Sequence, residues 1–171
     1  ASCSKQRSSL SSAAPDAART AQPGCLGHRL HPGLYAATGA LFDALSDGEA
    51  NIWPAVYIQW ELGLLHELGF GLDLSSCAAT GEVENLIYVS PRTGRAVSQG
   101  AGHPYRDRML TLPRFLRPDG RGHGADNTDF SDGLKLTGFF LARHAFDPLD
   151  RGLPASRERL ETLVTRMRTD Q

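Results

Sequence analysis

Cysteine is scarce in this chain of 171 residues, and its three copies, Cys3, Cys25 and Cys77, follow no regular spacing. An odd number of widely spaced cysteines argues against a disulfide framework and fits a reducing compartment. Long apolar runs are also missing, because polar residues interrupt the densest one, residues 53–74, well short of the roughly 20 apolar residues of a membrane span. No apolar signal segment follows the first basic residues, so we expect a cytoplasmic protein without a membrane span.

Large apolar side chains are almost absent from residues 1–27, which are rich in Ser, Ala, Gln and Pro. Such a segment cannot bury enough surface to offset an ordering entropy of roughly 1 to 2 kcal/mol per residue. The rest of the chain has the composition of an ordinary globular protein of one domain. We therefore expect a disordered or truncated N-terminal segment over residues 1–30 and a single domain over residues 31–171.

Basic residues are absent from residues 30–91, which carry eight acidic residues. From Arg92 onward the chain has fourteen basic and ten acidic residues, and sixteen of its eighteen basic residues are arginine. The planar guanidinium of arginine binds phosphate or carboxylate through two hydrogen bonds at once. This distribution predicts an anion-binding surface in the second part of the chain, although a solvated face with ordinary ion pairs would have the same composition.

Helical spacing of apolar residues predicts four helices, over residues 32–46, 54–68, 131–146 and from Pro154 onward. The second is apolar around most of its circumference, which predicts a central, buried helix whose polar stripe contains His66 and Glu67. The third is expected to begin with Ser131 as its cap. In the last helix, an apolar stripe is expected to lie opposite Arg157 and to consist of Leu160, Leu163, Val164 and Met167.

Two short β-prone runs, residues 86–90 and 95–98, flank the turn-forming sequence Pro-Arg-Thr-Gly and predict a β-hairpin. We expect one or two helical turns over residues 110–116 and an exposed loop over residues 117–130, which are rich in Gly and Asp. The predicted fold class is mainly α, a helical domain with a small β-hairpin insert.

Recognisable catalytic motifs are missing from the sequence, including Walker A, Gly-x-Ser-x-Gly and His-Glu-x-x-His. His66 next to Glu67 is more typical of a hydrogen-bonded interior histidine than of a catalytic base. A metal-dependent hydrolase would need Asp126, Asp129 and Asp132, but their spacing before a helix is more simply that of a capping segment. We expect neither an enzyme nor a cofactor.

Positions 77, 80, 98 and 101 have the spacing of a zinc ribbon, C-x2-C-x17-C-x2-C, in which a hairpin joins two ligand pairs. Only Cys77 is a cysteine, and Thr80, Ser98 and Ala101 stand at the other three positions. A tetrahedral zinc site needs four good ligands. We therefore expect a degenerate, zinc-ribbon-like hairpin that binds no metal, in which Cys77 is a small buried residue.

The stretch from Trp60 to Leu74, then Cys77, Thr80-Gly81 and the segment from Tyr88 to Gly94, resembles the C-terminal region of the bacterial RecO family, especially its alphaproteobacterial members. The similarity covers about residues 31–165 and is most specific between the second helix and the hairpin. In the family an N-terminal OB-fold precedes this region. Residues 1–30 leave no room for it, so we expect the OB-fold to be absent and the chain to be a fragment or a truncated version.

The resemblance implies a DNA repair and recombination mediator of the bacterial nucleoid. Such proteins bind single- and double-stranded DNA and, with RecR, help to load RecA onto DNA covered by single-strand binding protein. We expect weak, sequence-independent phosphate contacts from four arginines near the hairpin, Arg92, Arg95, Arg106 and Arg108. Because the OB-fold is not expected, the alternative is a protein-interaction module without annealing activity.

A partner site is predicted on the third helix, where Lys135, Phe139 and Arg143 follow each other at spacings of four. Gly138 beside the ring is expected to leave space for another chain. This row suits a peptide with acidic residues, an apolar side chain and a free carboxylate, the kind of tail that the resemblance implies for single-strand binding protein. In the alternative, Phe139 points into the core and the two cations are merely solvated.

Overall fold

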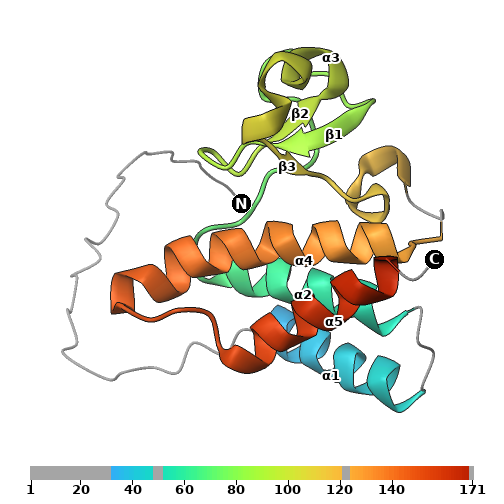
Figure 1. The fold of residues 1–171 in the computed structure, drawn as a ribbon, viewed down its shortest axis with the longest axis vertical. Helices are drawn as coiled ribbons and strands as arrows, with labels where there is room; N and C mark the ends of the chain where they lie inside the picture. The colour runs from blue at the N-terminus through green and yellow to red at the C-terminus, as the bar shows by residue number, and fades with distance from the viewer. Residues whose placement is uncertain (1–31, 48–51, 121–123, 170–171) are drawn as a thin grey trace, which may run out of the picture. The chain divides into compact units, whose positions relative to one another are not determined.

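The computed structural model describes residues 32–47, 52–120 and 124–169. Four long helices pack together, namely α1 (Pro32–Ser46), α2 (Trp53–Glu67), α4 (Asn127–Leu141) and α5 (Ala155–Thr169). A small sheet lies against one side of this helical layer, next to α4, and α1 lies on the opposite side (Figure 1). The predicted mainly helical domain with a small β insert is confirmed. The expectation for residues 1–30 lies outside the described residues, so the domain division stays a prediction.

The sheet has three antiparallel strands in the order β2-β1-β3. They are β1 (Leu86–Val89), β2 (Ala96–Ser98) and β3 (Leu110–Thr111). Strands β1 and β2 form the predicted hairpin, and Gly94 ends its turn with a φ of +67°, a conformation that glycine adopts without strain. Helix α3 (Gln99–Gly102) and the 3₁₀ helix η1 (His103–Arg108) connect β2 to β3.

Two apolar clusters hold these elements together. One lies between the sheet and α4 and includes Leu86, Val89, Leu136 and Phe140. The other joins α2, α4 and α5 through four buried side chains, Ile58, Phe130, Leu134 and Val164. Helices α2 and α4 both contribute to the two clusters, α2 through Leu65 and Ile58, so α4 shares the central, buried place that the sequence pattern predicts for α2. Burial of this kind is worth roughly 1.5 to 3 kcal/mol for each large apolar side chain.

The region before α4 differs from its prediction. Residues 110–116 form β3 and a 3₁₀ turn, η2 (Arg114–Leu116), and another 3₁₀ turn, η3, covers Pro118–Gly120. Helix α4 begins at Asn127 rather than after Ser131, because Asp126 and Asp129 form a capping box. Ser131 is therefore not the cap. It is buried inside the helix, where its hydroxyl lies 3.2 Å from that of Thr165.

The orientation of α5 and the environment of His66 also differ from their predictions. In α5, Arg157 is on the buried face, with 5% of its surface exposed, whereas Leu163 and Met167 are each 54% exposed. The predicted stripe is wrong at Leu163 and Met167 but confirmed at Val164, which is buried in the core. Arg157 is on the buried face because its guanidinium has a buried carboxylate partner, Glu61, which periodicity cannot reveal. His66 is exposed rather than interior. Within the described ranges, no helix is both long and apolar enough to span a membrane.

Candidate nucleic-acid interface

The hairpin turn between β1 and β2 brings predicted DNA-binding arginines to one end of the sheet. Val89, the last residue of β1, lies opposite Ala96 of β2 and Leu110 of β3. Both pairings are antiparallel, so the residues just before Ala96 and just before Leu110 lie at the end where β1 enters the turn. Arg95 and Arg108 are therefore placed at the same end of the sheet as the turn.

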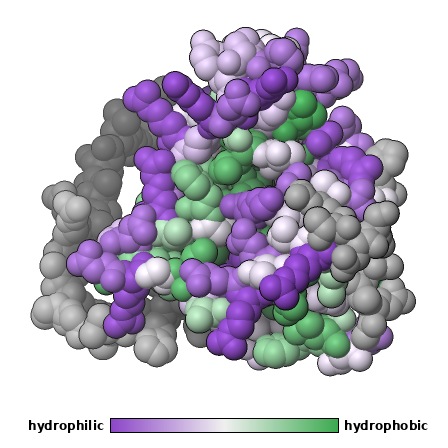
Figure 2. Space-filling view, in the orientation of Figure 1, coloured by the Kyte–Doolittle hydropathy of each residue, from purple (hydrophilic) through white to green (hydrophobic). Residues whose placement is uncertain are grey.

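Exposure of the four predicted arginines fits a surface site. Arg92 in the turn and both Arg106 and Arg108 in η1 are exposed, and Arg95 is partly exposed. Hydrophilic side chains flank the part of the molecule that carries the sheet and α3, and apolar atoms lie between that part and α4 (Figure 2). The structure thus leaves these cations accessible to solvent, and DNA binding by them stays a prediction.

A fourth arginine, which is not among the predicted DNA-binding residues, joins this end of the sheet. The Nη1 atom of Arg143 donates a hydrogen bond to the backbone carbonyl of Pro91 in the hairpin turn, at 2.9 Å. Arg143 follows α4 in a short π-helical segment, Ala142–Phe146. The sequence spacing had grouped Arg143 with Lys135 and Phe139, and no sequence signal links it to a turn 52 residues away. We call Arg92, Arg95, Arg108 and Arg143 the hairpin-end arginines.

Acidic partners neutralise part of this charge. The Nε atom of Arg95 lies 3.2 Å from Oδ2 of Asp73, and hydrogen bonds from Ser75, followed by that from Arg95, hold the pKa of Asp73 below its usual value. The Nε atom of Arg106 lies 3.6 Å from Oδ1 of the adjacent Asp107, and both side chains are well exposed. Exposed ion pairs of this kind are weak, so a phosphate can compete for either arginine.

The predicted partner row lies on the outer surface of α4 and of the turn that follows it. Lys135, Phe139 and Arg143 are all exposed, and the Phe139 ring, at 37% exposure, packs edge-on against Phe140. The expectation for Gly138 is wrong. Gly138 is buried, and a Cβ atom there would lie 3.4 Å from Nη2 of Arg157, so α5 already occupies the space intended for another chain. Peptide binding by the row stays a prediction.

At the four zinc-ribbon positions, a hydrogen bond joins Cys77 to the hairpin, but the side chains do not form a set of metal ligands. Cys77 is buried, and its sulfur accepts a hydrogen bond from the backbone N–H of Ser98 at 3.2 Å. Burial raises the pKa of the Cys77 thiol, but hydrogen bonds from Ser98 and Thr80 outweigh burial and lower it to about 6. The hydroxyl of Thr80 donates to Oε2 of Glu82 at 3.0 Å, and the side chain of Ala101 has no metal-binding atom. These side chains do not fit a structural zinc ion.

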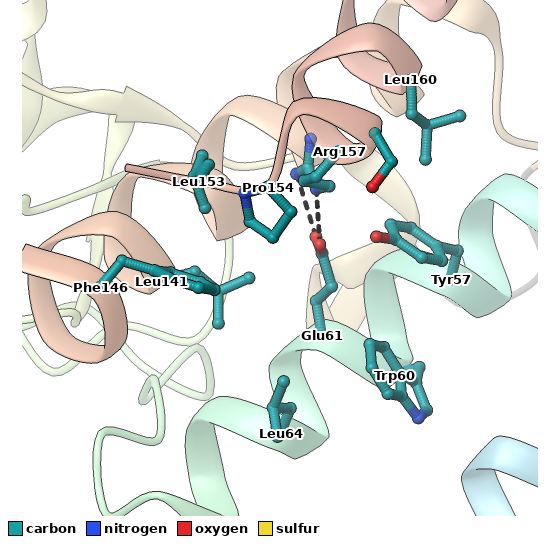
Figure 3. A pocket seen from close by; sticks show the side chains of 11 residues that line it. Tyr57, Trp60, Glu61, Leu64, Leu141, Phe146, Leu153, Pro154, Arg157 and Leu160 are labelled. Atoms are coloured by element: carbon teal, nitrogen blue, oxygen red, sulfur yellow. Dashed lines mark hydrogen bonds and ion pairs between the residues drawn. The ribbon is translucent and has the colours of Figure 1, made fainter. Parts of the chain in front are cut away.

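A pocket of about 360 Å³ opens between α2, the end of α4 and the start of α5. Its walls are mainly apolar and include Leu64, Leu141 and Leu160, and the ion pair of Glu61 with Arg157 lies at its floor (Figure 3). Sequence reasoning missed this pocket because three segments far apart in the chain form it. Burial, followed by the nearby carboxylate of Glu61, raises the pKa of Tyr57 in the wall to about 12.

Both side chains of the ion pair at the pocket floor make several hydrogen bonds. Arg157 donates from Nε to Oε1 of Glu61 at 2.5 Å and from Nη2 to Oε2 at 3.0 Å. Its Nη2 atom also donates to the carbonyl of Leu134 at 2.7 Å, and the hydroxyl of Thr137 donates to Oε2 of Glu61. Burial lowers the pKa of Arg157, but the Glu61 carboxylate outweighs that effect and raises it. With these bonds formed, Glu61 is a structural group that joins three helices rather than a catalytic base.

Comparison with known proteins identifies the family. A sequence model described as "Recombination protein O C terminal" matches residues 28–151 of the chain. The chain belongs to the RecO family. Its mainly helical fold with a small sheet is thus that of the family's C-terminal region.

Curated relatives carry the name "DNA repair protein RecO". The protein of Caulobacter sp. (strain K31) is 52% identical over 142 residues, which are 82% of this chain and 57% of that protein. The protein of Rhodospirillum centenum is 55% identical over 131 residues, or 75% of this chain and 50% of that protein. The chain therefore spans about half the length of the curated relatives it matches. No solved structure matches it significantly.

Proposed function

We propose that this chain serves DNA repair and recombination as a nonenzymatic mediator domain that binds DNA phosphates through the hairpin-end arginines. The observation that carries the proposal is their convergence on one end of the sheet from the turn, from η1 and from the segment after α4. Guanidinium groups bind phosphate oxygens through paired hydrogen bonds. Family membership supports a repair function, since the matched relatives are named for it.

The wider role follows from the same proposal. The chain would assist the loading of RecA onto single-stranded DNA covered by single-strand binding protein, with RecR as a further partner, in the cytoplasm at the nucleoid. A cation cluster without catalytic groups can hold a DNA strand in place while partner proteins exchange on it. We therefore expect DNA binding that depends on charge and not on sequence.

Salt dependence of DNA binding tests the proposal. Titration of a labelled oligonucleotide with the full chain at several salt concentrations gives the slope of log Kobs against log salt. The double substitution Arg92→Ala with Arg108→Ala should weaken binding and reduce the magnitude of this slope by about one for each phosphate that the variant no longer binds. The matched control is Arg159→Ala on α5, whose Nε atom donates to the carbonyl of Ala155 in its own helix. Equal slopes for the double variant and the unaltered chain would contradict the proposal.

A second candidate function, protein interaction without DNA binding, is favoured by the exposed row of Lys135, Phe139 and Arg143. A labelled peptide with acidic residues, a terminal apolar side chain and a free carboxylate is the probe. Lys135→Glu with Phe139→Ala should weaken its binding about tenfold or more, because charge and ring contacts are removed together. Arg143 is left intact since it also binds the hairpin.

Leu163→Ala, which removes another exposed apolar side chain on α5, is the control for the peptide titration. Unchanged peptide affinity in the folded double variant would remove the row as a partner site. Peptide binding by a chain that ignores DNA at low salt would favour this second function over the first.

A further inference from the structure

Tyr105 is exposed on η1 among basic residues. The chain has four tyrosines, and Tyr57 and Tyr88 are partly buried, whereas 59% of Tyr105 and 83% of Tyr35 are exposed. Neither apolar cluster of the described residues includes Tyr105, and no described ring stacks on it. The ring therefore contributes little to the core, and its apolar face is open to a ligand.

The backbone that carries Tyr105 is held in place although its side chains are exposed. Just before η1, Gly102 is buried so closely against Tyr88 that a Cβ atom would lie 2.3 Å from the ring. At its other end, Met109 packs against the apolar cluster between the sheet and α4, and β3 follows at once. Both ends of η1 are thus held by the core and the sheet, so η1 is a fixed platform rather than a free loop.

Two cationic side chains follow this ring in the chain. Arg106 and Arg108 come after Tyr105 in η1, and both are exposed. The strand pairing places Arg108 at the end of the sheet that carries the turn with Arg92. An aromatic face beside cations is the combination that binds single-stranded nucleic acid, because the ring stacks on a base and the cations bind neighbouring phosphates.

We propose that Tyr105 is a stacking residue for an unpaired base, and that Arg106 and Arg108 bind the phosphates next to that base. The proposal rests on the proposed function and deepens it, since it names single-stranded nucleic acid as the ligand of η1. The bases of a duplex are stacked on each other and cannot lie flat on Tyr105. Phosphates are present in both forms, so the arginines alone give no preference between them.

Substitution of Tyr105 separates stacking from charge. The full chain and its Tyr105→Ala variant are titrated with a labelled single strand of thymidines and with a labelled duplex at one salt concentration. We expect the variant to lose about 5- to 100-fold in affinity for the single strand, the range measured when a stacking ring is removed. Affinity for the duplex and the salt slope should stay unchanged. Tyr105→Trp should retain single-strand binding because it keeps an aromatic face.

Tyr35→Ala is the matched control, since Tyr35 is also exposed but lies in a part of the chain without basic residues. Circular dichroism establishes that each variant is folded. Equal loss for the single strand and the duplex, or unchanged single-strand affinity, would overturn the stacking role and leave salt-dependent binding by the arginines intact. If the unaltered chain binds neither form at low salt, both this proposal and the proposed function fail.

Discussion

At the residue scale, the most consequential contact is the buried pair of Glu61 and Arg157. Two charges out of water are tolerated here because the carboxylate and guanidinium satisfy each other and also bond Thr137 and the carbonyl of Leu134. Such a pair adds little net stability compared with apolar residues of the same size, but removing one partner leaves the other buried and uncompensated. The change in stability that a substitution causes therefore depends on whether one partner is replaced or both.

We predict that Glu61→Gln lowers the free energy of unfolding by about 3 to 5 kcal/mol, because Arg157 stays buried without a countercharge. The double substitution Glu61→Leu with Arg157→Leu should cost much less than the sum of the two single changes. Urea unfolding of the unaltered chain, of each single leucine variant and of the double variant measures this coupling. A loss below about 0.5 kcal/mol for Glu61→Gln, as for an ordinary surface substitution, would show that the pair is not buried as described.

At the element scale, the start of α4 is fixed by Asp126, Asp129 and Arg114. Asp129 accepts hydrogen bonds from Nε and Nη2 of Arg114 at 2.9 and 2.7 Å and from the backbone N–H of Arg114 at 2.9 Å. The Arg114 guanidinium also contacts Asp126. Burial raises the pKa of Asp129, but the bonds from Arg114 outweigh burial and lower it. The carboxylate thus ties the segment after β3 to the first turn of α4.

This lowered pKa predicts an acid-dependent loss of stability. The folded pKa lies below the unfolded value of about 3.9, so the contribution is fully present above that value and disappears as the pH falls through the folded pKa. Asp129→Asn should cost about 1 to 3 kcal/mol at pH 7. At a pH below the folded pKa, the variant and the unaltered chain should differ much less. Urea unfolding at the two pH values decides it, and an equal difference at both would contradict the assignment.

The elements also show where sequence reasoning succeeds. Local signals predicted α1, α2 and the β1–β2 hairpin, because Pro32, Pro54 and Gly94 act on their own neighbours in the chain. Helix α4 begins earlier than predicted although the capping box of Asp126 and Asp129 is a local signal, because Ser131 is an equally good cap residue in the sequence. Strand β3 is two residues long and has no periodicity of its own, because its pairing with β1 defines it. The link between Arg143 and the turn, and the burial of Arg157, are likewise tertiary contacts.

At the scale of the whole molecule, charge is divided between early and late elements. The Asp, Glu, Lys and Arg residues of the segment 30–91, which includes α1, α2 and β1, are all acidic. The arginines lie in the turn, in η1 and in the later elements. A polyanion is repelled by the first group and attracted by the second. We therefore expect DNA to approach from the end of the sheet that carries the turn, where the hairpin-end arginines lie.

The distance in sequence between Glu61 and Arg157 also affects when the helical core can form during synthesis. The two residues are 96 positions apart, so at about 5 to 20 residues per second the ribosome makes Arg157 roughly 5 to 20 s after Glu61. During that interval the carboxylate has no guanidinium to accompany it out of water, so we expect α2 to pack only loosely against α4. We also expect a nascent chain that stops before α5 to leave this part of the core open, so that completion of the core depends on α5.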